Sequence, residues 1–160
     1  TGVPAAVAEL DKSLRPRIRH QAGRDKADET RDCYRRYAVD ADVDPFVDDM
    51  AAAYRWADIV ICRAGALTVS ELMAAGKPAV LVPFPFAVDD HQTVNARFLT
   101  ESGAGLLMQQ RDITARSLGV LLHDLLSDRE RLSDMAKRAY ALAQRDATRV
   151  VADHCEEVAA

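Results

Sequence analysis

The chain has 160 residues, of which 49% are hydrophobic and 29% are charged, and this is ordinary for a globular domain with a sizeable core. Its formal net charge is −4, so a broad basic face for binding nucleic acid is not expected. No stretch approaches the ~20 consecutive apolar residues that a membrane-spanning helix needs. These totals favour one globular domain over residues 1–160.

Strand-like and helix-like patterns alternate along most of the chain. Short apolar runs bounded by turn residues predict strands or extended segments at 17–21, 43–47, 58–62, 78–84 and 104–108. Helical periodicity predicts helices at 3–10, 25–38, 48–57, 67–75, 89–103 and 114–126, and one that reaches about 144. This alternation predicts right-handed βαβ units, and therefore an α/β fold with a Rossmann-like parallel sheet, flanking helices and a helical carboxyl-terminal tail.

Cap residues mark where some of these helices begin and end. Gly76 and Pro78 are expected to end the helix at 67–75. Ser127 and Glu130 have the spacing of a capping box, which predicts that Ser127 is the N-cap of the following helix. Asp146 is placed to cap a final helix.

The stretch CRAGALTVSE (62–71) joins an apolar strand to a helix through a glycine turn. Ligands of an open parallel sheet bind at such strand ends, and the unpaired N–H groups of a helix start favour phosphate. Gly65 would let the backbone come close to a ligand, while Thr68 and Glu71 share one helix face. Arg63 could pair with a phosphate, but it could equally be a surface residue, with Glu71 merely complementing the helix dipole.

A second strand end carries the stretch PFPFAVDDHQTVNA (83–96). Asp89 or Asp90 can cap the helix that follows. His91, Gln92 and Asn95 lie in its opening turns, and imidazole and amide groups can both donate to and accept from a sugar. For His91 alone, the simpler interpretation is a polar residue at a helix start.

Metal and disulfide chemistry have little support. Asp42 and Asp44 resemble a DxD metal motif, but the loop at 41–50 could instead present backbone groups to a flat base. Cys33, Cys62 and Cys155 lie far apart without CxxC spacing, which argues against a disulfide framework or a zinc knuckle. A reducing cytosol, and so a cytoplasmic location, fits this usage best.

Together these segments resemble a known family. FVDDMAAAYRWADIVICRAGALTVSELMAAGKPAVLVPFPFAVDDHQTVNA (46–96) resembles the carboxyl-terminal domain of the MurG family, the peptidoglycan glycosyltransferases that add N-acetylglucosamine to lipid I to give lipid II. DDMAAAY, ADIVICRAGALTVSEL, AAGKPAVLVPF and DDHQTVNA match in order and with family-like spacing, and HQAG (20–23) matches the end of an early strand. The likeness weakens after about 110 and in the helix at 25–38.

The resemblance implies a GT-B architecture, in which two Rossmann-like domains face each other across a cleft. This chain would be most of the half that binds the donor, UDP-N-acetylglucosamine. Carried over by position, the substrate-binding residues are Val47, Met50, Arg63, Gly65, Ala66, Leu67, Thr68, Glu71, His91, Gln92 and Asn95. The resemblance assigns the uracil to Val47 and Met50, and the diphosphate to the turn from Gly65 to Thr68.

The remaining positions are assigned in the same way. The resemblance gives the ribose to Glu71 and matches Arg63 to an arginine of the donor site. His91 and Gln92 align with a pair that contacts the sugar, followed by Asn95. Close relatives of the family carry Gln where this sequence has His91, so the sugar contact is better supported for Gln92.

The expected reaction inverts the anomeric centre and needs parts outside this chain. We expect the chain to be a fragment that lacks its first strand with a glycine-rich loop, and also the amino-terminal acceptor domain. That domain would carry the lipid I site, the general base and the face that docks on the inner side of the cytoplasmic membrane, so no catalytic residue is assigned here. No cofactor is required by the implied fold, and a divalent cation is not indicated.

Two other functions fit the same residues. The chain could belong to another GT-B transferase or an epimerase that uses a different UDP-sugar. It could also be a free-standing, non-catalytic module that binds a UDP-sugar. The identity of the donor and the sequence upstream of Thr1 would separate these alternatives.

Overall fold

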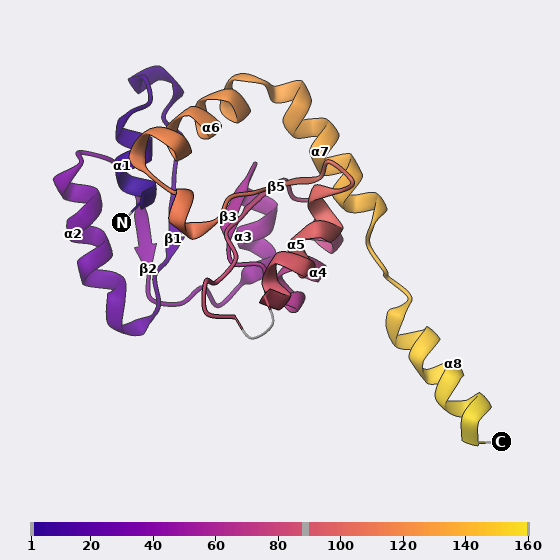
Figure 1. Cartoon of the computed structure of the whole chain (residues 1–160). Helices are drawn as coiled ribbons and strands as arrows, with labels where there is room; N and C mark the ends of the chain where they lie inside the picture. Colours follow the sequence, from indigo (N-terminus) through magenta and orange to yellow (C-terminus); the bar gives the residue numbers. More distant parts are fainter. Residues whose placement is uncertain (1, 88–89, 160) are drawn as a thin grey trace. The chain divides into compact units, whose positions relative to one another are not determined.

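The structure of the protein is a computed structural model that describes residues 2–87 and 90–159. Its helices are α1 (Gly2–Ala8), α2 (Ala27–Arg36), α3 (Met50–Trp56), α4 (Ala66–Ala75), α5 (His91–Thr100), α6 (Ala115–Ser127), α7 (Arg129–Ala141) and α8 (Ala147–Ala159) (Figure 1). Its strands are β1 (Arg19–Gln21), β2 (Asp42–Asp44), β3 (Val60–Cys62), β4 (Ala79–Leu81) and β5 (Gly105–Leu107). Short 3-10 turns lie at η1 (Lys12–Leu14), η2 (Arg24–Lys26) and η4 (Gln110–Asp112).

The chain divides into two compact units. Unit 1 contains Thr1–Ala57 and Met108–Ser133, and unit 2 contains Asp58–Leu107 and Asp134–Ala160. In unit 1, β1 and β2 pair in parallel, and in unit 2 the order is β3-β4-β5, again parallel. The predicted α/β class with parallel strands and flanking helices is confirmed.

The strands are shorter than the sequence predicts, and they form two sheets within the described residues, where the sequence suggested one. Pro45 follows β2, and Pro83 lies two residues beyond the end of β4. Proline has no N–H to give to a strand ladder. The chain therefore leaves the sheet at both places and continues as a loop.

Each unit buries its own apolar side chains. In unit 1 the buried residues include Val7, Val43, Leu118, Leu122 and Leu125. In unit 2, Ala79, Val80 and Leu81 of β4 are fully buried, together with Leu72 of α4 and Leu99 of α5. The central strand of unit 2 thus carries no polar side chain, as expected for a strand covered on both faces.

The predicted helix end at Gly76 and the predicted helix start at Asp146 are confirmed in position, whereas the predicted helix start at Ser127 is wrong. Gly76 ends α4 in the left-handed conformation, with φ 60° and ψ 48°, which glycine adopts without a steric penalty. The capping box at Ser127 is not formed, because Ser127 is the last residue of α6. The N–H of Arg131 instead donates to the carboxylate of Asp128 at 2.8 Å. Helix α8 begins directly after Asp146, where the sequence placed a helix start.

Candidate functional site

The turn between β3 and α4 lies at the carboxyl end of a half-buried strand. Gly65 is the N-cap of α4, with φ −64° and ψ 147°, and it supplies no side chain to cap the helix. The first N–H groups of a helix have no partner within it and form the positive end of its dipole. Leu67 in this first turn is 73% exposed. This helix start is therefore suited to an anion such as a phosphate.

Polar side chains of α4 follow this start. Thr68 and Glu71 are three residues apart and both are half-buried, so they lie on one face. Ser70 instead donates its hydroxyl to the Ala66 carbonyl at 3.0 Å. Thr68 and Glu71 therefore extend the polar surface of the turn, while the hydroxyl of Ser70 is hydrogen-bonded to the backbone of α4.

Arg63 is bound to the loop that leaves β4. Its Nη1 donates to the carbonyl oxygens of Val82 at 3.2 Å and Pro83 at 2.9 Å. Its guanidinium also lies 5.5 Å from the ring centroid of Phe84, within the range of a cation–π interaction. The side chain thus connects the β3–α4 turn to the loop at 82–84, which is a structural role alongside any contact with phosphate.

Gln92 binds the same loop from the side of α5. Its Oε1 accepts a hydrogen bond from the Phe84 N–H at 2.9 Å. Because a backbone N–H can only donate, the oxygen of the amide must face it. The NH₂ end of the amide therefore points elsewhere, as a donor of two hydrogens.

Asn95 binds the turn itself. Its Nδ2 donates to the Ala64 carbonyl at 3.0 Å, and Ala64 is completely buried. A carbonyl can only accept, so here the amide orientation is the reverse of that at Gln92. The other end of the amide, the Oδ1 of Asn95, takes no part in this hydrogen bond.

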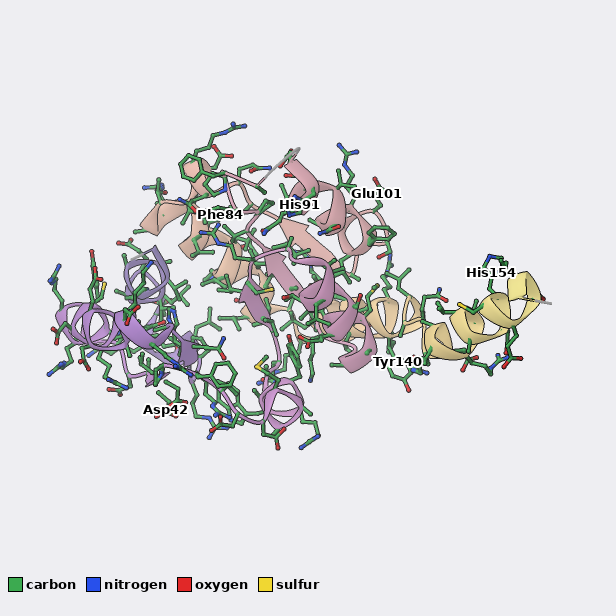
Figure 2. The ribbon with its side chains drawn as sticks, turned by 90° about the horizontal axis from the view of Figure 1, so that it is seen from below. Asp42, Phe84, His91, Glu101, Tyr140 and His154 are labelled. Atoms are coloured by element: carbon green, nitrogen blue, oxygen red, sulfur yellow. The ribbon has the colours of Figure 1, made fainter. Side chains whose placement is uncertain are left out.

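The start of α5 contains the remaining predicted residues. His91 is exposed, and Figure 2 shows it near Phe84, in agreement with the hydrogen bond that joins residues 84 and 92. Asp90 occupies the N-cap position with a left-handed φ of 51°, but its carboxylate makes no bond to the helix backbone. It accepts instead from the Thr93 hydroxyl at 2.7 Å. Asp89, the other predicted cap, lies outside the described residues.

Val47 and Met50 lie in unit 1, on the loop after β2 and at the start of α3. Val47 is 9% exposed, and its N–H donates to Oε1 of Gln21 at 2.9 Å. Asp49 caps α3 by accepting from the Ala52 N–H at 2.7 Å. Both ends of this loop are thus fixed by side-chain oxygens.

Gln21 is a residue that sequence reasoning did not assign to the site. It ends β1, and the following N–H groups of Ala22 and Gly23 donate to the carbonyls of Asp44 and Pro45 at 2.9 and 3.1 Å. Pro45 has no N–H that could continue the hydrogen bonds between the two segments. The next bond between them is therefore the one that the Gln21 side chain accepts from the Val47 N–H. The segment HQAG was the sequence signal that could have indicated a role for Gln21, but the hydrogen-bond partner of Gln21, Val47, is distant in sequence.

Next to Gln21, His20 is a packing residue. Its Nδ1 lies 3.0 Å from the Tyr34 hydroxyl, and the two rings meet edge to face. Burial lowers the pKa of His20 and raises the pKa of Tyr34 to about 12. Burial likewise raises the pKa of Cys62 to about 12, so its thiol stays protonated near neutral pH.

Residues 2–87 and 90–159 also lack the features of a metal site and of a membrane-spanning helix. No group of three or more His, Cys, Asp or Glu side chains could hold a metal ion there. The DxD-like Asp44 lies 3.8 Å from the Arg19 guanidinium. Within the same described residues, no helix has the length and apolar character needed to cross a bilayer.

The sequence has close relatives. It is 57% identical over 157 residues to the UDP-N-acetylglucosamine--N-acetylmuramyl-(pentapeptide) pyrophosphoryl-undecaprenol N-acetylglucosamine transferase of Pseudomonas paraeruginosa, covering 98% of this chain and 44% of that protein. The protein of the same name from Thiobacillus denitrificans is 55% identical, with 98% and 42% covered. The chain therefore spans less than half the length of these relatives.

A solved structure shows the same similarity as these relatives. The crystal structure of Acinetobacter baumannii MurG matches with a TM-score of 0.89 and 42% identity, covering 97% of this chain and 46% of that one. Residues 3–152 match the family described as "Glycosyltransferase family 28 C-terminal domain". The chain belongs to this family of glycosyltransferase carboxyl-terminal domains.

Proposed function

We propose that the chain is the donor-binding part of an inverting glycosyltransferase, which moves N-acetylglucosamine from UDP-N-acetylglucosamine to lipid I and so forms lipid II. The observation that carries this proposal is the open start of α4. Gly65 provides no cap, and the relatives that share this segment are named for transfer of this sugar. A diphosphate needs such a group of N–H donors and a positive dipole end.

Each part of the donor is assigned to a described segment. In unit 2, the first turn of α4 would bind the diphosphate, Glu71 the ribose, and His91 and Gln92 the sugar. For unit 1, taken by itself, the family resemblance assigns the uracil to the loop that carries Val47 and Met50. The NH₂ end of Gln92 suits a sugar oxygen, because its carbonyl end is already used by Phe84.

The chemistry asks little of this chain beyond binding and charge stabilisation. As the bond to the anomeric carbon breaks, negative charge develops on the departing UDP. The N–H groups and dipole of α4 would stabilise that charge without reorganising. The base that deprotonates the acceptor hydroxyl, the lipid I site and the membrane contact at the inner face are proposed to lie in the part of the enzyme that this chain does not include.

Removal of the Glu71 carboxylate tests the ribose assignment. Hydrogen bonds to a charged group contribute about 1.5–3 kcal/mol, so Glu71→Ala in the full-length protein should weaken UDP binding roughly tenfold to a hundredfold, as measured by calorimetry. Glu130→Ala, which removes an exposed carboxylate from α7, is the matched control. Equal UDP affinity in wild type and Glu71→Ala would contradict the assignment.

A second UDP-sugar remains the main competitor for this site. Competition for the full-length enzyme between UDP-N-acetylglucosamine and other UDP-sugars distinguishes the two, because the true donor should bind more tightly than the other UDP-sugars. A protein that binds the donor and transfers nothing would instead be a binding module.

A further inference from the structure

Three side chains of unit 2 connect three separate segments into a closed ring. Arg63, in the β3–α4 turn, donates to the carbonyls of Val82 and Pro83 in the loop after β4. Gln92 of α5 accepts from the N–H of Phe84 in that loop. Asn95, also of α5, donates back to the Ala64 carbonyl in the turn. Each segment is therefore held by the other two.

The link through Asn95 is the one that touches the turn backbone directly. Ala64 has no exposed surface, so water cannot easily replace a lost partner of its carbonyl, and an unsatisfied buried carbonyl is costly. The next residue is Gly65, the N-cap of α4. The direction in which the first N–H groups of α4 point thus depends on how the Ala64 peptide is held.

We propose that Asn95 is a positioning residue for the diphosphate turn: it holds the Ala64 carbonyl so that the N–H groups behind Gly65 are already oriented for the anion. This inference rests on the proposed function, since it names what orders the proposed diphosphate turn. It differs from a sugar contact, because one N–H of Asn95 is bound to the turn backbone itself, whatever its second N–H and its Oδ1 bind. Preorganisation of this kind raises affinity by lowering the cost of ordering on binding.

A positioning role and a sugar contact differ in which ligand feels the substitution. UDP carries the uridine and the diphosphate but no N-acetylglucosamine. If Asn95 orders the turn, its loss must weaken UDP and UDP-N-acetylglucosamine by the same factor. If Asn95 touches the sugar, only the sugar nucleotide is weakened.

The test uses the full-length protein and calorimetry with both ligands. Asn95→Ala removes the donor, and Asn95→Leu keeps the approximate side-chain size but has no hydrogen to donate and adds no charge near the diphosphate. We expect each variant to bind both ligands about tenfold more weakly, equal to ~1.4 kcal/mol. Asn95→Leu carries the test if Asn95→Ala does not fold, as judged by thermal denaturation.

Two comparison variants make the result decisive. Gln92→Ala should weaken UDP-N-acetylglucosamine much more than UDP. Val94→Ala, an exposed neighbour on α5, should leave both affinities unchanged. Asn95 variants that bind UDP as wild type does would overturn the inference, whether or not the sugar nucleotide is weakened. Failure of the wild-type protein to bind UDP would instead overturn the proposed function.

Discussion

The claim that the start of α4 binds a diphosphate can be tested by placing a competing anion there. Gly65 has φ −64° and ψ 147°, which are typical of an N-cap residue and open to any side chain. A Cβ at this position would lie 3.7 Å from the Thr68 hydroxyl, an ordinary van der Waals contact. Gly65→Ala, Gly65→Ser and Gly65→Asp should therefore all fold.

Stability and binding should move in opposite directions in this series. Ser or Asp at the N-cap accepts from a first-turn N–H and stabilises a helix by a few tenths of a kcal/mol relative to Gly. The same N–H groups are then occupied when the diphosphate arrives. An Asp carboxylate about 5 Å from one phosphate charge adds a repulsion of roughly 1–3 kcal/mol, the range between bulk water and an effective dielectric constant near 20.

UDP affinity by calorimetry and melting temperature should be measured together for the full-length variants. We expect Gly65→Ala to bind UDP somewhat more weakly than wild type, because its Cβ hinders close approach of the diphosphate, Gly65→Ser more weakly still, and Gly65→Asp at least about tenfold more weakly than Gly65→Ala. The Ser and Asp variants should melt at or above the wild-type temperature. If Gly65→Asp melts normally and binds UDP as tightly as Gly65→Ala, the diphosphate does not lie at this helix start.

Two further predictions concern unit 1. Gln21→Ala removes the acceptor of the Val47 N–H, so hydrogen exchange at that amide should speed up and the free energy of unfolding should fall by about 1 kcal/mol; Gln21→Glu keeps an acceptor oxygen, and equal exchange in all three proteins would contradict the assigned role. Burial raises the pKa of Tyr34 from 10.0 to about 12, so the folded state holds this proton more tightly than the unfolded state. That contribution is complete below pH 10 and is lost as pH rises toward 12. Urea denaturation from pH 9 to 12 should show this loss in wild type and a smaller one in Tyr34→Phe, and identical slopes would refute it.

Most helices could be predicted because their signals are local. The start of α4 and its end at Gly76 follow from a glycine turn, apolar spacing and the left-handed cap. The capping box at Ser127 failed because Ser127 and Asp128 are adjacent residues of equal capping ability, and the length of α6 decides between them. That length depends on packing, which the local pattern does not carry.

The sequence grouped the candidate residues by segment, but it did not give the contacts that they make. Sequence placed Gln92 and Asn95 together in the first turns of α5, where both were expected to face a sugar. The structure gives their amides opposite orientations, because one meets a backbone donor and the other a backbone carbonyl. Gln21 was missed because its hydrogen-bond partner, Val47, is 26 residues away, and a local sequence pattern does not show such a contact.

The most direct test of the central claim is transfer itself. The full-length protein should be incubated with UDP-N-acetylglucosamine, labelled in the sugar, and lipid I, and the labelled lipid II should be measured. We expect transfer by wild type and strongly reduced transfer by Gly65→Asp at subsaturating donor. No labelled lipid II from a folded wild-type protein that binds UDP, or undiminished transfer by Gly65→Asp, would contradict it.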